Sequence, residues 1–260
     1  MEHPTAVQNP GPVLEATNLA TLCGSAVFFL LMFVYVAPAV LRKVFPQYAS
    51  LPASKRIIMD DAFLSQVHML ILAPLGWYIY LFTELPPRAL FFDHPLVRLG
   101  AAIETAYEFL GLLLSLSIPA LRLPSFIFHH ALVSCMAVVQ MIYKCSPHTH
   151  NLGFICMTSN VFLNNRTLLN GVGKGNTKFA MWNGIALAVV FFYVRIAMLG
   201  VEWWHVYHMA MQPGYFQNVP FLVFLVDIPC NFLFTILNCY WFSKICRIGW
   251  KITFGKAKNN

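Results

Sequence analysis

Residues 125–143 form the sequence SFIFHHALVSCMAVVQMIY, an apolar stretch that contains no Asp, Glu, Lys or Arg. As an α-helix it is long enough to cross the hydrocarbon core of a bilayer, which takes about 20 residues. An adjacent pair of histidines, His129 and His130, interrupts its apolar character near one end. The stretch therefore predicts a transmembrane helix that carries ionisable side chains inside the membrane.

Six further apolar blocks of similar length lie at residues 16–41, 62–82, 99–120, 152–169, 179–199 and 219–242. In lipid the backbone polar groups must be satisfied within the segment, so we expect each block to be a helix. The composition agrees, since 58% of the 260 residues are apolar and 10% are charged, against roughly 25% charged residues in soluble domains. We predict an all-α integral membrane protein with seven transmembrane helices.

The basic residues predict the orientation of these helices. With seven spans, one side of the membrane carries twelve Lys and Arg residues and the other carries Arg88, Arg98 and Lys144. Because basic residues concentrate on the cytosolic side, we expect a lumenal N-terminus and a cytosolic C-terminus. The net charge of +7 then reflects topology, and we expect no nucleic-acid partner.

These expectations divide the chain into four parts. They are a lumenal tail at 1–15, a first transmembrane helix at 16–43, a six-helix membrane domain at 55–244 and a basic cytosolic tail at 245–260. Lys256 and Lys258 in the last five residues match the K-x-K-x-x pattern by which coat proteins retrieve membrane proteins to the endoplasmic reticulum. We therefore expect residence there, with a generic basic tail as the alternative.

Ionisable and amide groups inside the spans predict the functional site. We expect His68, His129, His130 and Arg166 to lie within roughly 10 Å of the cytosolic boundary, at 1.5 Å per helical residue. Such groups are costly in a membrane and often functional. We assign a catalytic role to these four if the protein is an enzyme, and a lipid-binding role to Glu108, Asn165, Asn183 and Asp227. The alternative is that polar groups only hold the helices together.

Two carboxylates on one helix need partners. Glu104 and Glu108 are four residues apart and share a helix face, so one of them is protonated or a cation such as Arg166 pairs with Glu108. We expect Arg195, near the lumenal end of its span, to reach the interface. Two groups resemble metal ligands by spacing, Cys145 with two His residues and Glu202 with two more. Interfacial His residues are common without metal, so we expect no metal and no cofactor.

Several of these residues carry a resemblance to the TLC domain, the family of ceramide synthases and TRAM-type proteins. The carriers are Phe128-His129-His130-Ala131, Asn160 to Arg166, Asn183-Gly184, Val190 to Ile196 and Trp241 to Ile245. The chain resembles the small TLC-domain proteins of the transmembrane-protein-56 type more than the ceramide synthases. The resemblance implies that the last six helices form a bundle around a lipid-accessible cavity.

The chain departs from the ceramide synthases in its acidic residues. The aspartates that follow their paired histidines are absent, and Met157-Thr158-Ser159-Asn160 stands where relatives have a glutamate. These differences favour a protein that binds, senses or distributes acyl lipids, such as ceramide-related lipids or phospholipids. The alternatives are an acyltransferase that uses acyl-CoA as co-substrate, and a structural or cargo-receptor subunit of a membrane complex.

Overall fold

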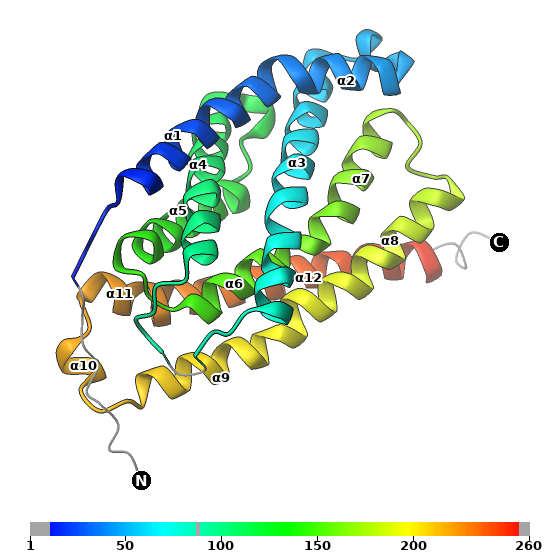
Figure 1. The fold of residues 1–260 in the computed structure, drawn as a ribbon. Helices are drawn as coiled ribbons and strands as arrows, with labels where there is room; N and C mark the ends of the chain where they lie inside the picture. The colour runs from blue at the N-terminus through cyan, green and yellow to red at the C-terminus, as the bar shows by residue number, and fades with distance from the viewer. Residues whose placement is uncertain (1–10, 87–88, 255–260) are drawn as a thin grey trace.

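The fold of this protein is a set of long helices, given by a computed structural model that describes residues 11–86 and 89–254 (Figure 1). Three helices run without a break: α3 (Ala53–Phe82), α4 (Pro95–Ser117) and α5 (Pro124–Tyr143). In the described residues, extended pairing is limited to one isolated bridge between Phe91 and Cys145. The predicted all-α fold class is confirmed.

Three more long helices each contain a π-helical segment. The first joins α1 (Ala16–Leu31) to α2 (Ala37–Val44) through 32–36, and the second joins α8 (Lys178–Phe191) to α9 (Met198–Ala210) through 192–197. The third joins α11 (Phe221–Leu225) to α12 (Asn231–Phe254) through 226–230. With the three unbroken helices, they make six helices that are long and apolar enough to cross a membrane. Such π segments are often found at functional sites.

The block predicted at 152–169 is a broken helix. It lies in α6 (Pro147–Cys156) and α7 (Asn160–Gly171), which are separated by a 3-10 turn at Met157–Ser159. The Ser159 hydroxyl donates to the Cys156 carbonyl oxygen at 3.0 Å. Neither half is long enough to span a membrane by itself, so the count of seven stays a prediction.

Residues at the helix ends explain where the chain turns. Proline occupies the first position of α4, α5 and α6, where its missing N–H costs no hydrogen bond. Lys144 and Ser146 adopt left-handed φ values of 52° and 50° in the sharp connection between α5 and α6. The short helix α10 (Tyr215–Asn218) and Pro220 separate α9 from α11.

The helices pack in neighbouring pairs around the interior. Helix α4 lies against α5 and α1, while α3 lies against α6 and α7. Helix α8 contacts α7 and α12, so the carboxyl-terminal helix closes against the middle of the chain (Figure 1). On α1, Asn18 and Phe29 are the buried residues, and Val27, Leu30 and Tyr35 are exposed on α1 and the π segment that follows it. This helix therefore presents an apolar outer face, as expected in lipid.

Four charged residues connect the start of α1 with the start of α4 and with the end of α5. Glu15 accepts hydrogen bonds from Arg98 at 2.5 Å and from Lys144 at 2.7 Å. Asp93 lies 2.9 Å from Arg98 and 2.8 Å from Lys144. The Lys144 hydrogen bond, followed by the charges of Arg98 and Lys144, lowers the pKa of Glu15. We call this group the four-residue ion network.

Candidate functional site

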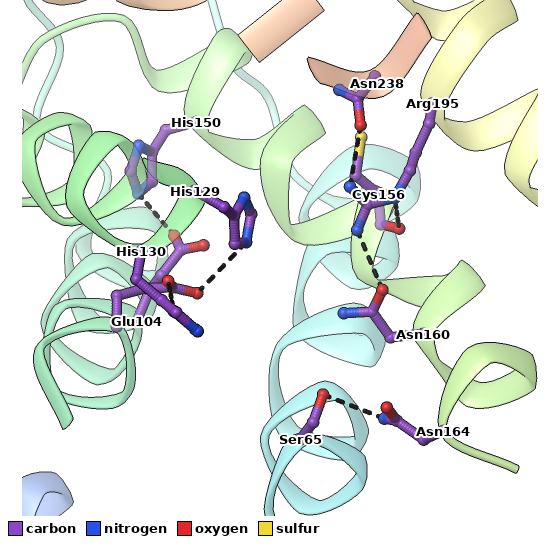
Figure 2. Close-up of polar contacts among 11 residues, drawn as sticks. Ser65, Glu104, His129, His130, His150, Cys156, Asn160, Asn164, Arg195 and Asn238 are labelled. Atoms are coloured by element: carbon purple, nitrogen blue, oxygen red, sulfur yellow. Dashed lines mark hydrogen bonds and ion pairs between the residues drawn. The ribbon is translucent and has the colours of Figure 1, made fainter. Parts of the chain in front are cut away.

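The centre of the candidate site is a carboxylate that lies between two adjacent imidazoles. Oε2 of Glu108 on α4 lies 2.6 Å from Nδ1 of His130 on α5, and Oε1 lies 3.9 Å from Nε2 of His129. Figure 2 labels the two histidines. A Cβ atom at Gly111 would lie 2.5 Å from the His130 ring. The glycine one turn beyond Glu108 therefore leaves the space that the imidazole occupies.

His68 joins this group through an aromatic ring. Its imidazole stacks on Tyr107, with centroids 3.7 Å apart, and the Tyr107 ring meets His130 edge to face. Asp61 lies two turns before His68 on α3 and therefore on the same helix face. Helices α3, α4 and α5 thus bring together three of the four predicted catalytic residues.

The two histidines are partly accessible although the carboxylate is not. The side chains of His129 and His130 are 20% and 13% exposed, whereas that of Glu108 is 2% exposed. The His129 ring contacts Trp241 and Phe234 of α12. Nδ1 of His129 and Nε2 of His68 are buried without a hydrogen-bond partner in the described residues. Unpartnered buried polar atoms are rare in folded proteins and point to a missing partner such as a ligand or water.

The second carboxylate of α4 also faces an imidazole. Oε2 of Glu104 lies 3.2 Å from Nε2 of His150, which follows the start of α6 (Figure 2). Both carboxylates of the pair therefore have histidine partners. The suggestion that Arg166 pairs with Glu108 is wrong, because Glu108 reaches α5 rather than α7.

Arg195 is buried, so its predicted extension to the interface is wrong. Its residue surface is 5% exposed. Nε donates to Ser159 Oγ at 2.9 Å and to the Cys156 carbonyl oxygen at 3.2 Å, while Nη1 and Nη2 donate to the side chains of Asn238 and Asn160. The helix runs from Lys178 to Ala210, which is longer than the predicted span, and Arg195 is near its middle rather than its end.

The remaining predicted residues on α7 and α8 lie apart from the Glu108 group. Arg166 and Asn165 are half-buried on α7, and in the described residues neither makes a side-chain hydrogen bond to the Glu108 group. Asn183 of α8 donates to the Phe162 carbonyl oxygen at 2.7 Å. That bond holds α8 against α7, which is the helix-joining role of polar groups in membranes.

Asp227 belongs to another cluster, formed by the connection after α5 and by the π segment before α12. Its carboxylate accepts hydrogen bonds from Ser146 and, at 3.2 Å, from Tyr215. A pocket of about 280 Å³ lies beside this cluster and is lined by Tyr215, Phe216, Val219, Phe221 and Phe224. The predicted cavity at the paired histidines stays a prediction, as do the lipid-binding roles of Asn165, Asn183 and Asp227.

Several residues of the site are absent from the sequence-based set. Asp61 lies seven residues before the predicted His68, which places the two residues on one face of α3. That periodicity was a usable signal for Asp61. Tyr107 offered none, because a Tyr in an apolar helix is common without a role.

The helices and the buried ionisable groups define a multi-pass membrane protein with a polar interior. The chain belongs to the TLC domain family, whose model matches residues 58–247. It is 29% identical over 248 residues to TLC domain-containing protein 4-B of Danio rerio, an alignment that covers 94% of each chain. It is 25% identical to TLC domain-containing protein 4 of Homo sapiens, over 88% of each chain. A TLC domain-containing protein of Schizosaccharomyces pombe is 25% identical over 85% of this chain and 75% of its own length.

Proposed function

We propose that this protein binds and handles acyl lipids in the endoplasmic reticulum membrane. The observation that carries the proposal is the Glu108 carboxylate at 2.6 Å from His130 and 3.9 Å from His129, beside the aromatic side chains of α12. A lipid headgroup with a hydroxyl or amide group can hydrogen-bond to the imidazoles. Its acyl chain can lie along Phe234 and Trp241, which contact the His129 ring.

The partial exposure of the paired histidines, together with two buried imidazole nitrogens that can accept or donate a hydrogen bond, supports a binding role. Polar groups that only join helices are expected to be satisfied by one another. Here His129 Nδ1 and His68 Nε2 have no partner in the described part of the chain, although both are buried. A bound headgroup supplies the missing hydrogen bonds. The partial exposure of His129 and His130 gives the lipid a way to reach them.

The proposed location and orientation follow from the sequence. Lys256 and Lys258 lie outside the described residues, so the retrieval role of the tail rests on its K-x-K-x-x ending. A cytosolic coat protein is the proposed partner. Replacing both lysines with serine should move a tagged protein from the endoplasmic reticulum to later compartments in microscopy. Unchanged localisation would refute the retrieval signal.

Photocrosslinking can test lipid binding inside the protein. Purified protein is incubated in nanodiscs with a long-chain fatty acid amide that carries a diazirine on its acyl chain, and labelled peptides are mapped by mass spectrometry. We expect labelling of Phe234, which is 8% exposed, as well as of outward Phe232, which is 55% exposed. Excess unlabelled lipid should compete at Phe234 and not at Phe232. Labelling confined to the outward residues would contradict the proposal.

A second candidate is an acyl-CoA-dependent N-acyltransferase. Ceramide synthases carry acids close to their histidines in sequence, and here Glu108 supplies a carboxylate from another helix. In the reaction, the amine nitrogen attacks the thioester carbonyl carbon and the carbon–sulfur bond breaks. The imidazole removes the amine proton and returns it to the departing CoA thiolate. The products are an amide and CoA.

Labelled acyl-CoA tests this candidate directly. Purified protein with a long-chain base should form a labelled amide, and His130→Ala should lower the rate by about 100-fold or more, the usual contribution of a general base. His148→Ala is the matched control, because His148 lies on α6 outside the site. Amide formation that survives replacement of both His129 and His130 would exclude this mechanism.

A further inference from the structure

The buried guanidinium of Arg195 has only neutral partners. It donates to Ser159 Oγ at 2.9 Å. It also donates to the Cys156 carbonyl oxygen, Asn160 Oδ1 and Asn238 Oδ1, at 3.0–3.2 Å (Figure 2). Within the residues that the structure describes, Arg195 forms no salt bridge to Asp or Glu. A buried charge that lacks a counter-ion is strongly destabilising. An anion bound next to Arg195 would balance this buried charge.

Spare donors surround the same position. A guanidinium has five N–H groups, and the hydrogen bonds above leave one on Nη1 and one on Nη2 without an acceptor in the described residues. Asn238 is fully buried, and its Nδ2 also lacks a partner there. Asn238 binds Nη1 through Oδ1, so its amide N–H groups lie next to the spare guanidinium donors. Phosphate and carboxylate oxygens are the acceptors that such a set binds best.

The helices are irregular where Arg195 lies. It belongs to the π segment at 192–197 and bonds to residues in and next to the 3-10 turn at 157–159. The Arg195 group and the histidine group face each other from two sets of helices (Figure 2). The Arg195 group therefore lies in the same interior as the histidine group, on a different set of helices.

We infer that Arg195 and Asn238 bind the anionic group, a phosphate or a carboxylate, of an acyl lipid. The inference rests on the proposed function and names the class of its lipid. Glu108 makes its short contact with His130, whereas the partners of Arg195 in the described residues are all neutral. From the sequence we expected Arg166 to pair with Glu108 or to act in catalysis, whereas the structure brings the spare donors together at Arg195.

A purely structural role for Arg195 predicts a different effect on stability and on lipid binding. If it only caps the freed carbonyl of Cys156, then adding a carboxylate beside it stabilises the protein and leaves lipid binding unchanged. Asn238→Asp makes that change. It keeps the Oδ1 acceptor for Nη1, removes the spare Nδ2 donors and supplies an internal counter-ion. Asn170→Asp, at an exposed position on α7, is the matched control for net charge.

The test compares lipids that differ in headgroup charge. The full chain in phosphatidylcholine nanodiscs is titrated with mono-oleoyl phosphatidate, oleate and uncharged mono-oleoylglycerol, and Trp fluorescence gives each Kd. We expect the anionic lipids to bind about tenfold tighter than the glycerol ester, the effect of one or two charge-assisted hydrogen bonds. Asn238→Asp should remove this preference, and Asn170→Asp should keep it. Thermal unfolding of both variants checks their folding.

Competition between ligands shows which anionic group the protein recognises. Inorganic phosphate that competes with mono-oleoyl phosphatidate supports recognition of phosphate itself, while competition by oleate alone supports recognition of a carboxylate. Equal affinity of the wild-type protein for charged and uncharged lipids overturns the inference but keeps the proposed function. A preference that survives in Asn238→Asp also overturns it. If none of the three lipids binds, the proposed function fails as well.

Discussion

Oε2 of Glu108 lies 2.6 Å from Nδ1 of His130, and this contact joins α4 to α5 inside the membrane domain. The two residues are 22 positions apart in the chain. Both imidazoles of the pair face the same carboxylate, and Gly111 leaves room for the nearer ring.

Glu108→Gln should destabilise the protein and weaken lipid binding. The amide keeps the shape of the side chain but replaces a charge-assisted hydrogen bond with a neutral one, which costs about 1–3 kcal/mol. Chemical unfolding in detergent measures the change in free energy, and the crosslinking yield at Phe234 measures binding. The control is Glu84→Gln, since Glu84 is exposed after α3. Equal stability of the two variants would show that the contact contributes nothing.

Gly111→Ala should displace the His130 ring without removing any polar group. A Cβ there would lie 2.5 Å from the ring, so the imidazole must rotate away from Glu108. We expect a loss of about 1–3 kcal/mol in the free energy of unfolding, as for other overpacked sites.

Gly184→Ala on α8 is the matched control for that variant. An added Cβ at this position meets no heavy atom within 4 Å. It should gain about 0.5–1 kcal/mol from helix propensity. If both alanine variants bind lipid and unfold alike, the position of the His130 ring is unimportant.

The four-residue ion network should make stability fall in acid. The hydrogen bond from Lys144 and the neighbouring cations lower the pKa of Glu15 in the folded state. A carboxyl with a lowered folded pKa stabilises the protein above its ordinary pKa of 4.5, and this contribution disappears as the pH falls through the folded value. The unfolding temperature should therefore decrease between pH 6 and pH 3.

Glu15→Gln should show a smaller decrease over the same range, measured by thermal unfolding at several pH values. The pKa of Lys144 is raised by its hydrogen bonds to Asp93 and Glu15, so its contribution is lost only above the ordinary lysine pKa of 10.5. The contribution of the network to the stability of the protein should thus be constant between neutral pH and pH 9. An identical acid profile for the wild type and Glu15→Gln would rule out this role.

Tyr215→Phe should destabilise the cluster around Asp227. The change removes the hydroxyl that donates to Asp227 at 3.2 Å, while the ring, which is 1% exposed, stays packed. Loss of one hydrogen bond to a buried acceptor costs about 1–3 kcal/mol. Urea unfolding in mild detergent gives the difference from wild type. Tyr78→Phe, on an exposed ring, should be close to neutral.

The amino-acid sequence alone predicted most of the membrane-spanning helices. Six of the seven apolar blocks correspond to long helices, with ends within about ten residues of the predicted ones. Apolar blocks predict membrane-spanning helices well because the length needed to cross a bilayer can be read from one continuous stretch of the chain. The seventh block is divided between α6 and α7 by the 3-10 turn, where Ser159 Oγ and Arg195 Nε both donate to the Cys156 carbonyl oxygen. Whether it crosses the membrane stays a prediction.

The sequence also identified His129, His130, His68 and Glu108 as interior groups, because ionisable residues in apolar blocks stand out. Their pairing depended on tertiary structure. Which carboxylate meets which imidazole is set by the rotation and register of neighbouring helices, and each residue turns the helix face by about 100°. The π segment at 192–197 adds a shift that apolar patterning does not reveal. For that reason the burial of Arg195, and its bond to Asn238, were decided only by the packing of α8, α9 and α12 around the broken helix.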